Sequence, residues 1–453
     1  MNTVTRSTRQ RSPTRVPLTA DGLLLALGTA LIYVSLGALL FREITASDSL
    51  VNLGPYNFTT AEPILILLGL GSGFALIANR FRINAIVVAG VLLLAATVIA
   101  IVRGMLVDPL PALFTARQLV SIPLFLLFGA VIAPIDELHR RIAYAVKICG
   151  TVLAIMTVSR LTTGFPYGGA LEFDGRALLN YGALMISFAA MLMISDRIRG
   201  IGPRAQLPLA AFLLVACILT GQGTVILATM GGLPIIVLAE RGRLRAVRWL
   251  AAFLFVVVLV GLLIVQPILS QMIADDQLLS SYFEDRASTN ATRQAVWDAF
   301  LTQYSSRDSL DQAFGLPMGK TETLVLNLWH GTYWNRTLHS MYFETLSNFG
   351  YVGLTLYIAV LVLMLTLLLL NFRAATRRAE PQKISVVSAL ALTVMLVIFG
   401  YSYDLRGESS LLLMIVAAVA VNSSIRRPLG IAAASRSAIG KRQSVTSRPA
   451  ATH

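Results

Sequence analysis

His339 is the residue of this sequence that is best placed for acid–base chemistry. It lies in the stretch WNRTLHSMYFETLSNFGYVGL, where a polar segment passes directly into a long apolar one. The other three histidines are His139 beside a basic loop, His330 in mid-loop and His453 at the C-terminus. An unperturbed imidazole has a pKa of about 6.5 and exchanges a proton near neutral pH. From the residues alone, a catalytic role and a structural hydrogen bond remain equally open for His339.

The residues that follow His339 predict a helix whose packed face begins at that histidine. Glu344 lies five residues further on and well round the helix, which makes it a poor partner for the imidazole. Small residues on the packed face permit a close approach of neighbouring helices. That face carries Tyr342, Phe343, Leu346, Gly350 and Gly353.

A second predicted helix, Ser288–Tyr304, places a cation on an apolar face. At 3.6 residues per turn, one face carries Val296, Trp297, Phe300 and Tyr304 together with Arg293, and Asp298 and Thr302 point the other way. An arginine on such a stripe either extends its guanidinium to the membrane surface or meets an anion inside the protein. Both interpretations of Arg293 remain open.

Two further arginines are candidates for binding an anion at the same side of the protein. Arg117 lies just inside the fourth apolar segment, where a guanidinium reaching the membrane interface is the commoner role. Arg176 follows the loop that holds Glu172 and Asp174 and begins the next apolar segment. The E-x-D pair fits solvated loop charges better than a metal site. The chain has no D-x-D motif and no His/Cys cluster, and Cys149 and Cys217 lie inside apolar runs, so we expect no metal and no cofactor.

The elements that must position these residues are membrane-spanning helices. The chain of 453 residues is 56% hydrophobic and 13% charged, too apolar for the surface of a soluble domain. Its net charge of +14 does not indicate nucleic-acid binding, because the basic residues lie in short loops and tails between apolar runs. A run of about 20 apolar residues crosses a bilayer. The sequence therefore predicts an all-α polytopic membrane protein with about twelve spans.

The predicted organisation has five parts, of which only the third is a long loop. The parts are a basic tail at 1–20, spans one to nine at 21–269, an external loop with short helices at 270–340, spans ten to twelve at 341–423, and a second basic tail at 424–453. Around Gly221–Gln222–Gly223 the pattern fits either two spans joined by a tight turn or one broken helix. The spans are expected near 21–41, 63–79, 84–102, 112–134, 142–160, 178–195, 205–221, 223–239, 247–269, 341–371, 384–403 and 409–423.

Charge predicts the orientation of these spans. Arginine and lysine gather in both tails and in alternate short loops, which indicates that both termini are cytoplasmic. The long loop at 270–340 carries eight acidic and five basic residues, and its acidic balance fits the external side. The tails either contact anionic membrane lipids or, more simply, fix the topology.

The motifs of residues 290–355 resemble the C-terminal signature of the bacterial O-antigen ligase/polymerase superfamily. His339 is followed by Tyr342–Phe343–Glu344 and by Gly350 and Gly353, and upstream an R-x-x-x-W pair, Arg293 and Trp297, precedes Gly315 and Gly319. Two departures are visible. Ser340 stands where asparagine is frequent, and the turn Thr220–Thr224 lacks the arginine that many members carry.

The resemblance implies transfer of a glycan from an undecaprenyl-pyrophosphate carrier at the periplasmic face of the bacterial inner membrane. His339 would be the catalytic histidine, as a base or as an orienting group, and Arg293 would bind the pyrophosphate. Arg176, Arg117, Arg286 or Arg336 would replace the missing turn arginine. Tyr342, Glu344 and Trp297 would contact the acceptor or the glycan.

The acceptor separates the alternatives. A second lipid-linked repeat unit would make the protein a polymerase, which the missing arginine favours, and lipid A-core would make it a ligase. A lipid-glycan flippase or solute transporter is the alternative of another class, and it predicts charged residues along a cavity through the membrane. The centres of the spans carry almost no charge, which disfavours it.

Overall fold

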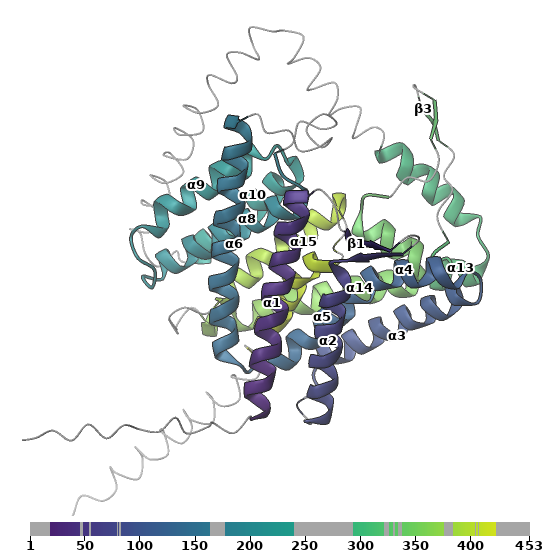
Figure 1. The fold of residues 1–453 in the computed structure, drawn as a ribbon, viewed down its shortest axis with the longest axis horizontal. Coiled ribbons are helices and arrows are strands. Elements are labelled where there is room, and N and C mark those ends of the chain that lie inside the picture. Colours follow the sequence, from purple (N-terminus) through teal and green to yellow (C-terminus); the bar gives the residue numbers. More distant parts are fainter. Residues whose placement is uncertain are drawn as a thin grey trace, which may run out of the picture.

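The structure is a computed structural model, and the part of the chain that it describes is mostly helical (Figure 1). The structure describes residues 19–45, 49–53, 56–78, 80, 83–163, 177–239, 293–320, 326–328, 331–333, 338–375, 384–403, 405 and 407–422. The prediction of a helical fold is therefore confirmed. Two short antiparallel hairpins, which the sequence did not predict, pair β1 (Ser49–Leu53) with β2 (Tyr56–Thr59) and β3 (Leu326–Leu328) with β4 (Gly331–Tyr333).

Within the described ranges, six helices are long and apolar enough to cross a membrane: Ala20–Thr45, Ala85–Met105, Pro109–Ile132, Asp136–Leu161, Asn180–Ile198 and Met341–Phe372. Five shorter apolar helices accompany them: Ala61–Ile77, Gln206–Leu219, Gly223–Ile236, Val386–Ser402 and Gly407–Asn422. The predicted span at 247–269 lies outside the described residues, and the other predicted spans all fall on these helices. The chain is a multi-pass membrane protein.

The helices that the text uses below have the following bounds. They are α1 (Ala20–Thr45), α2 (Ala61–Ile77), α3 (Ala85–Met105), α4 (Pro109–Leu119), α5 (Ser121–Ile132), α6 (Asp136–Thr163), α8 (Asn180–Ile198), α9 (Gln206–Leu219), α10 (Gly223–Ala239), α13 (Ser309–Phe314), α14 (Met341–Ala375) and α15 (Val386–Ser402), with the 3-10 turn η1 (Gly407–Ser410).

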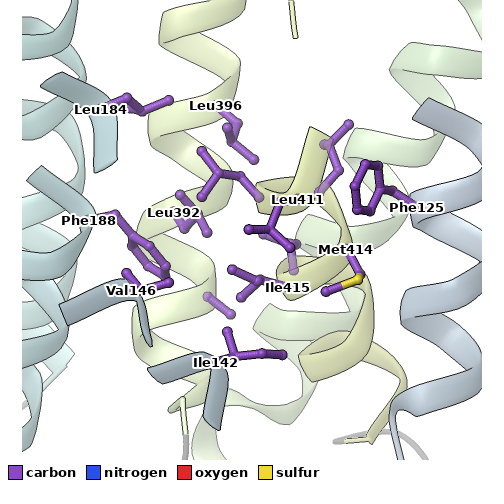
Figure 2. Close-up of a cluster of buried hydrophobic side chains, with 14 of the residues drawn as sticks. Phe125, Ile142, Val146, Leu184, Phe188, Leu392, Leu396, Leu411, Met414 and Ile415 are labelled. Atoms are coloured by element: carbon purple, nitrogen blue, oxygen red, sulfur yellow. The ribbon is translucent and has the colours of Figure 1, made fainter. Parts of the chain in front are cut away.

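The helix Gly407–Asn422 forms the centre of the bundle. Its residues 411–421 are all buried, as expected for a segment that is apolar on every side. Leu411, Met414 and Ile415 pack among side chains of α5, α6, α8 and α15 (Figure 2). Gly129 of α5 lets this helix approach closely, because a Cβ there would lie 2.6 Å from the carbonyl oxygen of Met414.

One predicted span is interrupted, and of the two interpretations left open around Gly221–Gln222–Gly223, the structure has two helices joined by a turn. The span expected at 112–134 consists of α4 and α5, joined at Val120, and Pro123 in the first turn of α5 has no N–H to donate. Around Gly221, where φ is +71°, the chain makes a turn. Helix α9 packs mainly on α8 and α10 mainly on α15, so the two helices diverge after that turn.

The helix expected to continue unbroken from residue 341 to 371 is kinked at Gly350. This glycine has φ +62° and ψ −163°, outside the helical region. The prediction of close packing at Gly350 holds, but the partner is the backbone of the loop: a Cβ on Gly350 would lie 2.4 Å from the carbonyl carbon of Ala313. Gly315 reciprocates, since a Cβ there would lie 2.3 Å from the carbonyl carbon of Asn348. The loop therefore docks on α14 backbone to backbone.

The segment after α13 is held on its other side by α3 and α4. Leu316 N donates to Ser347 O at 2.9 Å, and Met318 N donates to Ala100 O at 3.3 Å. Gly319, with φ +87°, passes so close to α4 that a Cβ would lie 2.4 Å from Ala112 N. Residues 315–319 are thus clamped between the start of α14 and the α3–α4 pair.

Replacing Gly350 by alanine is expected to destabilise the protein. The positive φ alone costs an L-residue about 1–2 kcal/mol, and the Cβ collides with backbone that cannot swing aside. The matched control is Gly69→Ala in α2, where a Cβ meets nothing within 4 Å. Thermal unfolding in detergent checks both variants. An equal melting temperature for Gly350→Ala and Gly69→Ala would contradict the backbone contact.

Candidate functional site

His339 lies on a strained turn at the start of α14. Among the described residues, His339 is the one non-glycine with positive φ, at +47°. Its side chain is exposed, whereas those of its neighbours Leu338 and Ser340 are buried. A non-glycine in this region costs about 1–2 kcal/mol and persists where the surrounding contacts over-determine it.

Those contacts fix the chain on both sides of His339. Leu338 N donates to Glu344 Oε1 at 3.0 Å, so a carboxylate in the first turn of α14 binds the segment before the helix. Ser340 Oγ donates to Gly400 O of α15 at 3.4 Å. With both neighbours held, the imidazole is presented at the surface from a fixed backbone.

The helix 293–305 joins this turn through Trp297. The indole Nε1 donates to Leu338 O at 2.7 Å, next to His339. The Trp297 ring lies 5.2 Å from that of Phe343 and 5.0 Å from that of Tyr401, measured between centroids. The predicted face of this helix is confirmed: its buried side chains pack on Leu338 and Leu346, and Asp298 and Thr302 are exposed. The buried set is Val296, Phe300 and Tyr304.

Arg293 lies one turn before Trp297 on the same helix and reaches α15. Its Nη2 donates to the hydroxyl of Tyr403 at 3.5 Å, and its guanidinium carbon lies 5.3 Å from the centre of that ring. The Tyr403 hydroxyl donates in turn to Gln222 Oε1 at 3.5 Å. Gln222 Nε2 donates to Leu178 O at 2.8 Å. The turn between α9 and α10 is thereby brought to Arg293.

An aromatic row continues from Tyr403 to a second arginine. Phe399 lies 5.1 Å from Tyr403 and 5.9 Å from Tyr181, between ring centroids. The guanidinium carbon of Arg42 lies 5.2 Å from the Tyr181 ring centre. Arg42 Nη1 also pairs with Glu408 Oε1 at 3.0 Å. Arg42 and Arg293 therefore stand at the two ends of one row of rings.

The base of the loop is anchored by a second set of contacts. The hydroxyl of Tyr304 donates to Gln312 O, and burial raises its pKa to about 12, so it remains the donor at neutral pH. Arg103 at the end of α3 donates to Gly315 O at 2.7 Å and pairs with Asp311 of α13. The helix that carries Arg293 is thus tied to α3 as well as to α14.

Of the other predicted site residues, the structure brings Glu344 to the turn of His339 and places Tyr342 and Arg117 in other contacts. Tyr342 donates from its hydroxyl to Val397 O at 2.9 Å and so is engaged in packing α14 on α15. Glu344 contacts the backbone of the His339 turn. Arg117 pairs with Glu62 Oε1 at 2.6 Å. Arg176, Arg286 and Arg336 lie outside the described residues, as do Glu172 and Asp174.

Sequence reasoning missed Tyr403, Gln222 and Arg42. Gln222 lies in the turn that was singled out for lacking an arginine, but nothing in the pattern joins it to Arg293. Arg42 precedes the buried Glu43, which is 2% exposed, and this charged pair at the end of the first span was the available signal. Ionisable residues inside apolar segments are functional candidates by default.

The arrangement unites a base, a cation and an aromatic surface. His339 offers an exposed imidazole, and Arg293 offers a guanidinium that has no carboxylate partner among the described residues. The rings of Trp297 and Tyr401 pack against each other beside them. Guanidinium groups bind phosphate with two parallel hydrogen bonds, and aromatic faces suit the apolar faces of sugars. Such a corner suits proton transfer beside an anionic leaving group.

Substitutions at His339 are expected to separate strain from chemistry. Asparagine tolerates the left-handed region and valine does not, so His339→Asn should unfold at or near the wild-type temperature and His339→Val several degrees lower. Thermal unfolding of both variants in detergent gives the answer. A valine variant as stable as the asparagine variant would mean that the turn is not strained.

Comparison with known protein families found a match over one part of the chain. Residues 208–358 match the family model described as O-antigen ligase. The matched region includes the α9–α10 turn, Arg293, Trp297 and His339. No curated protein matches the chain. The resemblance found in the sequence is thus confirmed for residues 208–358, which are similar to the O-antigen ligase family.

Proposed function

We propose that this protein is a glycosyltransferase that moves a glycan from an undecaprenyl-pyrophosphate carrier to an acceptor hydroxyl, at the periplasmic face of the bacterial inner membrane. The observation that carries the proposal is the hydrogen bond from Trp297 to Leu338. It holds the helix of Arg293 against the turn of His339. The O-antigen ligase match supports glycan transfer of this general kind.

In the proposed reaction, the acceptor hydroxyl attacks C1 of the donor sugar and inverts the anomeric centre. His339 accepts the hydroxyl proton as the new C1–O bond forms. The bond between C1 and the pyrophosphate oxygen breaks, and its electron pair leaves with the lipid pyrophosphate. A well-placed general base contributes about 10²–10⁴ to the rate of such a step.

Arg293 is proposed to bind the pyrophosphate. Its guanidinium stabilises the negative charge that grows on the leaving oxygen in the transition state, and this lowers the activation barrier. Tyr403 positions this guanidinium: its ring lies under the guanidinium, and its hydroxyl donates a hydrogen bond to Gln222. Pyrophosphate is already a good leaving group, so the proposed step requires no metal. Arg42, at the far end of the aromatic row, joins Arg117, Arg176, Arg286 and Arg336 as a candidate for the second phosphate contact.

The acceptor is proposed to be a second lipid-linked repeat unit, which makes the protein a polymerase. The basis is the turn at 220–224, where Gln222 stands instead of an arginine. Transfer to lipid A-core is the second candidate, favoured by the description of the matching family as O-antigen ligase. Both reactions use the same donor and the same proposed base.

Loss of transfer on substitution of His339 and Arg293 is the first expected outcome. With a lipid-pyrophosphate glycan donor, His339→Asn should lower the turnover about 10²–10⁴-fold, and Arg293→Ala about 10- to 100-fold. Arg293→Lys keeps the charge but not the two-pronged geometry, so its rate should lie between those of alanine and arginine. Arg80→Gln is the control, since Arg80 pairs with Asp21 at the start of α1, in a different part of the bundle. Near-normal turnover in folded His339→Asn and Arg293→Ala would sink the site assignment.

Deletion of the gene is expected to leave surface glycans with a single repeat unit on the acceptor. A polymerase is needed only to add further units, so the first unit still reaches the acceptor. Gel separation of the surface glycans distinguishes the two candidates. An unmodified acceptor, with long lipid-linked chains accumulating, would identify a ligase and overturn the polymerase assignment.

A further inference from the structure

A groove between α6, α8 and α9 stands outside the site described above. Its volume is about 580 Å³, within the range of small-molecule pockets. One face of α6 forms its floor, from Arg140 to Val152, and Met193, Asp196 and Leu209 contribute to the opposite wall. Neither the proposed transfer reaction nor the family match assigns it a role.

The groove lies at the end of the bundle opposite His339. Helix α15 connects the two ends: Ser385, which precedes it, contacts Ser195 Oγ at 3.2 Å, and Gly400 near its other end accepts the hydrogen bond of Ser340. Asp196 of the groove adjoins Ser195. At 1.5 Å per residue, α15 spans about 25 Å, so a substrate at His339 does not reach the groove.

One end of the groove is positively charged. Lys147 Nζ pairs with Asp196, and Arg199 Nη1 lies 3.6 Å from the other carboxylate oxygen of Asp196. Arg140 lies 3.4 Å from Glu137, to which Arg141 also pairs at 3.5 Å. The lining of the groove holds two cations, Arg140 and Lys147, and one carboxylate, Asp196, and this excess of positive charge fits an anionic group.

The rest of the groove is apolar and opens toward the surface where lipid would lie. Ile148, Val152 and Leu209 line it beyond the charged end. The side chain of Tyr144 is 66% exposed and that of Ile148 46% exposed, on a helix long enough to span the membrane.

We propose that this groove binds an anionic phospholipid. The phosphate lies at Arg140 and Lys147, and an acyl chain lies along Ile148, Val152 and Leu209. Basic pockets between spanning helices bind anionic headgroups in this way. Free phosphate shares the charge chemistry, but it leaves the apolar half of the groove without a counterpart.

The test titrates the full-length protein, solubilised in neutral detergent, with short-chain phosphatidylglycerol and counts bound lipids by native mass spectrometry. Phosphatidylcholine of the same chain length probes the anionic charge, and glycerol phosphate probes the headgroup alone. Arg140→Gln is compared with Arg80→Gln. The two arginines match closely: their side chains are 50% and 45% exposed, and each pairs with an acid, Glu137 or Asp21.

Phosphatidylglycerol should bind more tightly than either other probe. Arg140→Gln should weaken the affinity for phosphatidylglycerol about fivefold, whereas Arg80→Gln should leave that affinity unchanged. Val152→Trp, which narrows the apolar half without a change of charge, should weaken phosphatidylglycerol as well. Equal binding of the two phospholipids, or an equal loss in both arginine variants, would overturn the proposal. Glycerol phosphate binding as tightly as phosphatidylglycerol would identify a phosphate site and overturn the lipid assignment.

Discussion

The hydrogen bond from the indole of Trp297 to Leu338 O is the contact on which the candidate site depends. It joins two segments that are 41 residues apart in the chain and places Arg293 and His339 at one corner. Leaving a buried donor or acceptor unpaired costs about 1–3 kcal/mol, which makes the docked position strongly preferred. The rings of Phe343 and Tyr401 both pack against the indole, so the donor has little freedom to turn away.

Glycines make this docking possible at the base of the loop. The backbones at Gly315 and Gly350 meet so closely that no side chain fits between them, and Gly319 meets α4 in the same manner. Contacts between backbones are less adjustable than contacts between long side chains. Residues 315–319 of the loop are therefore fixed in the bundle, and the helix 293–305 is connected to this rigid segment.

The distribution of polar groups follows from the membrane environment. The central helix Gly407–Asn422 is apolar and buried, and the charged groups lie toward helix ends: Arg42 with Glu408 at one end of the bundle, and Lys147 with Asp196 at the other. A charge at the centre of a bilayer is costly, so charged chemistry gathers near the interfaces. Helix α15 contributes to both ends, with Tyr403 beside Arg293 and Ser385 beside Ser195.

The sequence alone determined the apolar spans, the buried face of the helix at 293–305, and the position of His339 at the start of a span. These features can be read from local composition, because spans appear as apolar runs and a buried helix face appears as apolar residues three and four positions apart. Only the tertiary structure decided the kink at Gly350, because a glycine that permits close helix packing and one that takes positive φ look the same in a sequence. It alone also joined Gln222, Tyr403 and Arg293, which lie on three separate elements. Contacts between distant residues leave no periodic signal, because they depend on how helices cross in space.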